Sequence, residues 1–163
     1  MMIFHNQFLS VEFKDNVIDA LKKYTQNSFK TQESGGILMG KRLLNGNIIV
    51  TDITIPQKGD TSRRYYFKKN KKIHQQLSDE IWEASMGKII YVGEWHTHPE
   101  KIPRPSSIDL TGWRLNTRDQ IDDKNYIFLI IGINEFGLWS NSKANGLLKM
   151  NLIQDQQIRN EIR

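Results

Sequence analysis

The chain of 163 residues contains no cysteine. This absence excludes disulfide bonds, zinc sites built from thiolates and catalysis by a thiol. The chain also lacks an apolar run long enough to cross a membrane. Its start, residues 1–7, has neither the basic segment nor the sustained apolar segment of a signal peptide. Together these absences predict a cytoplasmic protein.

Length and composition fit a single folded domain. Hydrophobic residues make up 38% of the chain and aromatic residues 10%, a composition that favours a packed core over disorder. The chain has no internal repeat, low-complexity segment or sign of a second domain. The sequence therefore predicts one domain over residues 1–153 and a polar C-terminal tail, interpreted as a frayed helix, over residues 154–163.

Positive charge is in modest excess, with a net charge of +5. The densest basic run is Lys68–Lys72. Such a run either faces nucleic acid or an acidic partner, or forms the solvated start of a surface helix. No aromatic stacking pattern or nucleic-acid motif accompanies it, so the helix interpretation is favoured.

Two histidines one residue apart, His96 and His98, are the most informative feature of the chain. They follow an apolar run at residues 89–92 that is typical of a buried strand. Side chains on a strand alternate between its two faces, so both imidazoles point the same way. Two imidazoles on one face can share a metal ion, and catalytic zinc usually takes three protein ligands and keeps a fourth position for water.

Asp109 is the natural candidate for the third ligand, because it lies where a helix should begin. Pro105 cannot continue a preceding helix, and Ser106 is a favourable N-cap. Asp109 follows the serine by three residues, as in a capping box. A strand ending in two histidines and a helix opening with Ser-X-X-Asp therefore predict a mononuclear zinc hydrolase site.

These segments resemble the JAMM motif of the JAB/MPN metalloproteases, in which His-X-His-Pro is followed after a short gap by Ser-X-X-Asp. Residues 96–99 and 106–109 match both parts. That family also uses a glutamate far upstream, just before a glycine-containing strand. Glu33, which precedes Ser34-Gly35-Gly36, fits that position. The resemblance extends roughly from residue 11 to residue 140.

The resemblance implies a role for each residue. His96, His98 and Asp109 would hold one Zn²⁺ ion, which lowers the pKa of a bound water from about 16 toward 7. Glu33 would take a proton from the water and later pass it to the leaving amine. Ser106 would donate a hydrogen bond to the oxyanion of the tetrahedral intermediate.

The remaining residues near this motif carry weaker predictions. Glu94 shares the strand face of the two histidines, so it either orients an imidazole or forms a salt bridge elsewhere. Trp95 and Trp113 are interpreted as packing the walls of the site. His5 and His74 are interpreted as structural or surface histidines.

Apolar periodicity and turn residues predict an α/β sandwich around one sheet. The resemblance implies the single-domain JAB/MPN fold, which is similar to the cytidine-deaminase-like architecture, with a mixed central sheet flanked by helices. Asn45-Gly46 predicts a type I′ turn, and Ile73, Leu77, Ile81 and Trp82 predict the inner face of the second helix. The predicted helices begin at the N-cap residues Asp15, Asn70 and Ser106. A polar loop over residues 57–64 leads into an aromatic run at residues 65–67. The predicted strands span 8–13, 36–44, 47–55, 88–98, 126–133, 138–140 and 147–153, and those at 88–98 and 126–133 are predicted to be buried.

The resemblance also implies a substrate class. JAB/MPN enzymes typically cleave isopeptide or peptide bonds after the C-terminal glycine of ubiquitin or a ubiquitin-like protein. Such a tail binds in an extended form and adds a strand to a sheet edge. By position alone, residues 57–64 and 99–105 would flank that groove, and the partner would be a protein with an extended C-terminal tail.

Residues 93–100 and 105–110 look most like the small bacterial stand-alone members of the family. Members encoded in anti-phage CBASS operons remove a cGAS-like nucleotidyltransferase from the protein to which a ubiquitin-like ligation machinery attached it. Related bacterial members instead process ubiquitin-like or sulfur-carrier proteins. A non-catalytic JAB/MPN scaffold is a further alternative, although this chain keeps every ligand residue. A zinc nucleoside deaminase needs a His-X-Glu and a Cys-X-X-Cys, which the absence of cysteine excludes.

Overall fold

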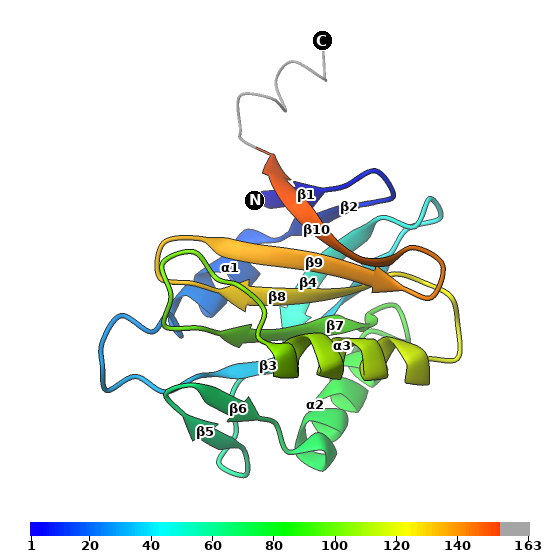
Figure 1. Ribbon diagram of the computed structural model, residues 1–163. Coiled ribbons are helices and arrows are strands. Elements are labelled where there is room, and N and C mark those ends of the chain that lie inside the picture. Colours follow the sequence, from blue (N-terminus) through cyan, green and yellow to red (C-terminus); the bar gives the residue numbers. More distant parts are fainter. Residues whose placement is uncertain (154–163) are drawn as a thin grey trace.

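One large sheet organises the molecule (Figure 1). The computed structural model describes residues 1–153, and the predicted frayed helix over residues 154–163 lies outside the described residues. The strands are β1 (Met2–His5), β2 (Ser10–Phe13), β3 (Gly35–Arg42), β4 (Ile48–Ile53), β5 (Thr61–Arg63), β6 (Tyr66–Lys68), β7 (Ile90–Thr97), β8 (Tyr126–Ile131), β9 (Phe136–Ser142) and β10 (Gly146–Ile153). The helices are α1 (Asp15–Lys22), α2 (Lys71–Ala84) and α3 (Ser107–Asp119).

Eight strands pair in the order β1-β10-β9-β8-β7-β3-β4-β2 and close into a barrel. The pairs β2/β4 and β7/β8 are parallel and the other pairs are antiparallel, which confirms a mixed sheet in one α/β domain. The predicted sandwich is corrected in one respect, because the sheet closes on itself. Closure depends on β1, which pairs with β2 on one side and with β10 on the other. This strand has four residues, too few to show a clear alternation in the sequence.

Strand β8 is buried on both faces, as predicted for a strand in the centre of the fold. Its odd-numbered residues join the interior cluster, to which α1 contributes Val17, Ile18 and Leu21. Its even-numbered residues pack in a second cluster with Trp113 of α3. Helices therefore cover opposite faces of the sheet, and Figure 1 shows α1 behind the strands and α3 in front of them.

Helix α2 begins where expected but is rotated relative to the prediction. The side chain of Asn70 accepts a hydrogen bond from the backbone N–H of Ile73, which confirms the N-cap. The residues that α2 buries are His74 and Ser78, whereas Trp82 is exposed. The rotation follows from polar contacts, because the His74 ring bonds both Thr54 and Asp60 and draws its side of the helix inward. This also confirms that His74 is a structural histidine.

Two local predictions fail at the backbone level. The expected N-cap Asp15 is instead the first residue of α1, and Lys14 is the N-cap without a side-chain cap bond. The hairpin between β3 and β4 is not a type I′ turn, because that turn needs positive φ at both central residues and Asn45 does not have it. Gly46 has φ +88° and donates to the Leu43 carbonyl at 2.9 Å. This is the pattern of a three-residue loop that ends in a left-handed glycine.

A small hairpin, β5–β6, occupies the segment predicted as a loop and an aromatic run. It packs on the start of β3 through Phe67. A Cβ atom on Gly35 would lie 2.6 Å from the Phe67 ring, so the close approach requires glycine there. The base of the hairpin is held by Asp60, whose carboxylate accepts from the backbone N–H groups of Gln57 and Asn70, both at 2.7 Å.

Between residues 1 and 153, no helix combines the length and the apolar character needed to cross a membrane.

Candidate metal and catalytic site

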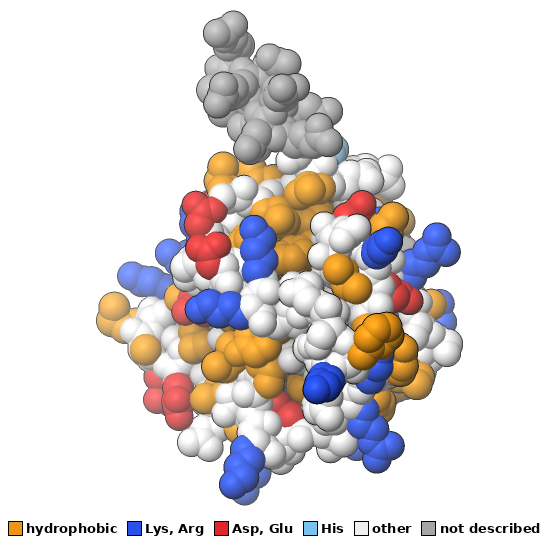
Figure 2. Space-filling model, turned by 90° about the vertical axis from the view of Figure 1, so that its left-hand side faces the viewer, with side chains coloured by type: hydrophobic (Ala, Val, Ile, Leu, Met, Phe, Trp, Pro, Cys, Tyr) orange, Lys and Arg blue, Asp and Glu red, His pale blue; other side chains and the backbone are white. Residues whose placement is uncertain are grey.

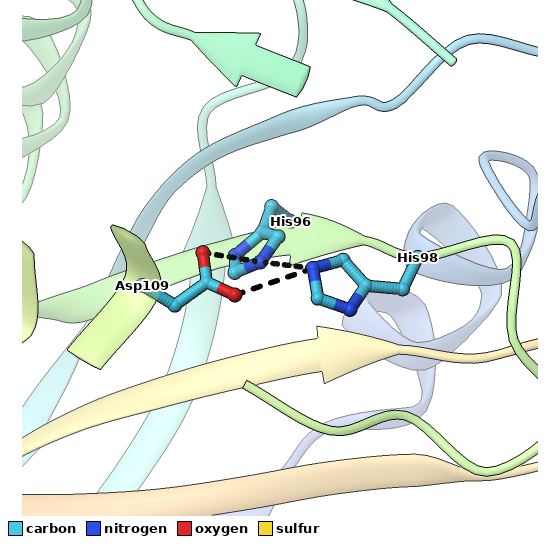
Figure 3. A group of neighbouring side chains, drawn as sticks. All are labelled: His96, His98 and Asp109. Carbon is cyan, nitrogen blue, oxygen red and sulfur yellow. Dashed lines mark hydrogen bonds and ion pairs between the residues drawn. The ribbon is translucent and has the colours of Figure 1, made fainter. Parts of the chain in front are cut away.

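The histidine pair lies at the C-terminal end of β7, with His96 inside the strand and His98 directly after it. Strand β7 lies between β3 and β8 in the barrel, so its end is held on both sides. His96 and His98 point to the same side, as the strand alternation predicts, and their Nε2 atoms lie 3.0 Å apart (Figure 3). Both side chains are mostly shielded from solvent.

Asp109 approaches the pair from the first turn of α3. Its Oδ1 lies 3.2 Å from Nε2 of His96 and its Oδ2 lies 3.3 Å from Nε2 of His98. The capping box is also formed, because Asp109 Oδ2 accepts from the Ser106 backbone N–H at 2.7 Å and Ser106 Oγ accepts from the Asp109 N–H at 3.1 Å. One carboxylate thus serves as helix cap and faces both imidazoles.

The donor set fits a metal ion. One ligand atom from each of His96, His98 and Asp109 lies within 4.8 Å of the others. Tetrahedral zinc with bonds of about 2.0–2.1 Å places its ligand atoms about 3.3 Å apart, close to the separations found between these side chains. Two neutral imidazole nitrogens at 3.0 Å repel each other through their lone pairs unless a proton or a cation lies between them. The arrangement is therefore compatible with a metal site.

Electrostatics within the cluster favour an ionised aspartate. Burial alone would raise the pKa of Asp109, but hydrogen bonds from His96 and His98 outweigh it and hold this pKa far below its usual range. Burial likewise would lower the pKa of His98, yet its hydrogen bond to Asp109 and the nearby carboxylates raise it. The cluster is thus built to keep an anionic oxygen facing two imidazole nitrogens.

Glu33 borders the cluster and is only 6% exposed. Its Oε1 lies 4.0 Å from Nε2 of His98. Strand β5 holds its backbone on both sides, because Glu33 N–H donates to the Arg63 carbonyl at 2.8 Å and the Ser62 hydroxyl donates to the Glu33 carbonyl. Burial raises the pKa of this carboxyl to about 7, with His98 acting in the opposite direction. Glu33 is therefore a group able to gain and lose a proton near neutrality.

The buried side-chain amide of Gln26, which the sequence does not single out, connects the histidine strand β7 to the β5–β6 hairpin. Gln26 accepts from the hydroxyl of Thr97, the residue between the two histidines, at 2.9 Å. The Gln26 amide donates to the carbonyls of Thr31 and Arg64 at 3.1 and 3.0 Å. The backbone N–H of Ser34 donates to Thr97 Oγ1 at 3.0 Å. No local pattern singles out Gln26, because its partners come from distant parts of the chain.

The structure resolves the role of Glu94, which the sequence left open, and brings Glu100 close to His98. Glu94 pairs with Lys69 and accepts from Asn116 at 3.2 Å, so it takes the salt-bridge alternative. Glu100 lies closer to the cluster, with Oε2 3.4 Å from Nδ1 of His98. Glu100 therefore places a carboxylate beside the second ring nitrogen of His98, the one that does not face Asp109.

A cleft of about 650 Å³ opens beside the cluster. The five predicted site residues all line it: Glu33, His96, His98, Ser106 and Asp109. The expected border at residues 57–64 is shifted, because Tyr65–Lys69 lines the cleft instead. Residues 99 and 100 line it from the second predicted segment. Trp95 and Trp113 form part of its walls, as predicted, and Trp113 stacks on Phe128 with ring centroids 5.0 Å apart.

This chain belongs to the family described as prokaryotic homologs of the JAB domain, whose sequence model matches residues 16–142. Among curated proteins, it is 36% identical to the CD-NTase/cGAS isopeptidase of Vibrio cholerae serotype O1, over 82% of this chain and 81% of that protein. It is 32% identical to the protein of the same name from Escherichia coli, over 85% of each chain.

Solved structures confirm the fold. The chain superposes on the solution structure of a Desulfitobacterium hafniense protein with a TM-score of 0.60 and 17% identity, covering 85% of this chain and 88% of that one. A protein from Salinibacter ruber gives a TM-score of 0.51 and 14% identity, over 88% and 90% of the two chains.

Proposed function

We propose that this protein is a zinc-dependent isopeptidase or peptidase that releases a cGAS-like nucleotidyltransferase from the proteins to which it is conjugated in bacterial anti-phage defence. The observation that carries the proposal is the convergence of His96, His98 and Asp109 beside Glu33 in one cleft. The curated relatives from Vibrio cholerae and Escherichia coli, both named CD-NTase/cGAS isopeptidase, supply the substrate class.

His96, His98 and Asp109 would hold the zinc ion. Two imidazoles and one carboxylate leave a position for water or substrate, which is the donor set of a catalytic rather than a structural zinc. When bound, zinc would polarise the scissile carbonyl group of the substrate and lower the pKa of a water molecule. Glu100 supports the site by facing the second nitrogen of His98, where a carboxylate fixes the orientation of the ring.

Glu33 performs the proton transfers. It accepts a proton from the attacking water and delivers that proton to the nitrogen of the leaving amine as the scissile bond breaks. Its burial suits both steps, because burial raises the pKa of the carboxyl and so strengthens it as a proton acceptor. The contacts from β5 hold its backbone, and with it the carboxylate, at the edge of the histidine cluster.

Ser106 stabilises the charge that develops on the carbonyl oxygen. Its Oγ already accepts the backbone N–H of Asp109, and its hydroxyl proton remains to be donated. It lines the same cleft as Glu33. A single donor of this kind typically contributes about 2.7–4 kcal/mol to transition-state stabilisation.

The substrate tail lies along the cleft in an extended form. Strand β5 uses its outer edge to hold Glu33, whereas within residues 1–153 no strand pairs with the outer edge of β6. Because Tyr66, Phe67 and Lys68 line the cleft, that free edge is available for an added strand. Main-chain hydrogen bonds to a free edge bind an extended peptide with little dependence on its sequence.

A cleavage assay with matched controls tests the proposal. The substrate is a cGAS-like nucleotidyltransferase fused through its C-terminus to a small reporter. We expect zinc-loaded wild-type protein to cut after the last native residue, and His96→Ala or treatment with a chelator to abolish cleavage. His5→Ala, which alters an exposed histidine of β1, should cut at the wild-type rate.

Metal analysis separates the alternatives. Stoichiometric zinc without cleavage of the fusion, but with cleavage of a ubiquitin-like or sulfur-carrier precursor, would replace the proposed substrate by that class. Protein that purifies and refolds without binding zinc would be a scaffold, and the enzymatic proposal would be wrong.

A further inference from the structure

Positive charge is concentrated in one segment of the chain. Residues 58–72 hold seven of the 23 basic residues and one of the 18 acidic residues, a net charge of +6. The rest of the chain holds 16 basic and 17 acidic residues, a net charge of −1. This segment contains the β5–β6 hairpin and the start of α2, and three of its seven basic residues line the cleft.

Three lysines of this segment line the cleft: Lys68, Lys69 and Lys71. Lys69 is paired with Glu94. Lys68 and Lys71 are exposed and form no ion pair with any residue between 1 and 153. One wall of the cleft therefore presents two uncompensated positive charges. Figure 2 shows basic side chains spread over the face it displays, interspersed with apolar, acidic and other groups, so charge does not gather there in one dense patch.

Helix α3 contributes both polar and apolar side chains to the cleft, and two of the apolar ones are exposed to it. Ile108 is 71% exposed and Leu115 is 44% exposed, although both are large aliphatic residues. Gly112 lies between them, and a Cβ atom placed there would have no neighbour within 4 Å. Glycine in a helix interior costs about 1 kcal/mol relative to alanine. No packing within the described chain requires glycine at this position. The open space beside Gly112 could instead be filled by a ligand bound in the cleft.

We infer that the cleft selects a protein tail that carries acidic side chains together with apolar ones, and this inference rests on the proposed function. Lys68 and Lys71 attract the acidic side chains, while Ile108 and Leu115 cover the apolar ones. Gly112 lets the main chain of the tail approach α3 closely.

A peptide fits this cleft better than a nucleic acid. Glu94, Glu100 and Asp119 also line it, and their carboxylates repel a continuous row of phosphates. A peptide can instead place single carboxylates next to the lysines and neutral residues next to the glutamates. The free edge of β6 matches the backbone of a peptide and has no counterpart in a nucleic acid.

Product-like peptides provide the test, because binding them needs no turnover. The probes are fluorescein-labelled peptides of ten residues with a free C-terminal carboxylate, identical except that four positions are all Glu, all Gln or all Lys. Fluorescence anisotropy with the zinc-loaded full chain should give a Kd about tenfold lower for the Glu peptide than for the Gln peptide, and the highest Kd for the Lys peptide. The difference should shrink at high salt, because exposed charges are screened.

Two double variants test whether the lysines of the cleft cause the preference for the Glu peptide. Lys68→Gln with Lys71→Gln should reduce the preference for the Glu peptide to less than threefold. Lys41→Gln with Lys149→Gln removes the same charge from exposed positions outside the cleft and should retain the tenfold preference. Circular dichroism confirms that each variant is folded.

Equal affinity for the Glu and Gln peptides would overturn the inference, as would an equal loss of preference in the two double variants. Stronger competition by a 20-nucleotide oligo(dT) than by the Glu peptide would show that the cleft binds nucleic acid in preference to an acidic tail. A charge preference without any cleavage of the fusion would leave the inference standing and remove the proposed substrate. Cleavage of the fusion without a charge preference would support the proposed substrate and overturn the inference.

Discussion

The hydroxyl of Thr97 donates to Oε1 of Gln26 at 2.9 Å, and the amide of Gln26 donates to the carbonyl of Arg64 at 3.0 Å. Both Thr97 and Gln26 are almost fully buried. One side chain therefore joins the strand that carries the two histidines to the hairpin whose first strand holds Glu33. This amide therefore supports the relative placement of the histidine cluster and the proposed base, together with the hydrogen bonds between Ser34 and Thr97.

Replacing the Gln26 amide should weaken the connection between the histidine strand β7 and the β5–β6 hairpin that holds Glu33. In Gln26→Leu the Thr97 hydroxyl and two backbone carbonyls lose their partner, so we expect a loss of about 2–4 kcal/mol in the free energy of unfolding. We also expect kcat to fall at least tenfold while zinc affinity changes little, because the proposed metal ligands are untouched. Urea denaturation, zinc competition with a chelator and steady-state kinetics measure the three effects. Asn27→Leu, at an exposed neighbour, is the control, and equal effects in both variants would contradict the coupling.

The carboxylate of Glu33 should be needed for turnover and not for metal binding. We expect Glu33→Gln to retain one zinc per chain and to lose about 10²–10⁴-fold in kcat, the range that general acid–base catalysis usually provides. Metal analysis and single-turnover cleavage of the fusion check this. Glu83→Gln, at an exposed position of α2, should cleave at the wild-type rate. Hydrolysis by Glu33→Gln at that rate would show that another group is the base.

The metal-free protein should lose stability as the pH rises. Burial raises the pKa of Glu33 from 4.5 to about 7, so the folded state holds this proton more tightly than the unfolded state does. The stabilisation is complete below pH 4.5 and disappears as the pH rises through about 7.

Chelator-treated wild type should therefore lose more free energy of unfolding between pH 5 and pH 8 than chelator-treated Glu33→Gln does. The excess should reach at most about 3 kcal/mol. Urea titrations at four pH values measure it, and parallel pH profiles for the two proteins would contradict the raised pKa.

Replacing Gly112 of α3 by alanine should stabilise the fold and at the same time weaken substrate binding. Gly112→Ala should raise the free energy of unfolding by about 0.5–1 kcal/mol, the usual difference between the two residues in a helix. It should also raise KM for the fusion substrate, because the methyl group occupies space in the cleft. Arg114→Ala, at an exposed α3 position that does not line the cleft, should leave KM unchanged. A more stable Gly112→Ala protein with unchanged KM would show that nothing approaches α3 there.

The parts of the site that could be predicted are those encoded over short distances. His96 and His98 share a face because strand geometry alternates, and Ser106 with Asp109 forms a capping box within one turn. Even so, their meeting required the end of β7 and the start of α3 to lie side by side, which the family resemblance supplied. The position of Glu33 came from that resemblance as well.

The sequence by itself determined the class of fold, the main strands, the start of each helix to within one residue, and the local geometry of the histidine pair and of the capping box. It could do so because apolar periodicity and caps depend on near neighbours. Tertiary structure alone decided the closure of the barrel by β1, the face that α2 buries, and the positions of Gln26 and Glu100. The physical reason is that strand pairing and buried hydrogen bonds join residues from distant parts of the chain, and no local pattern records those partners.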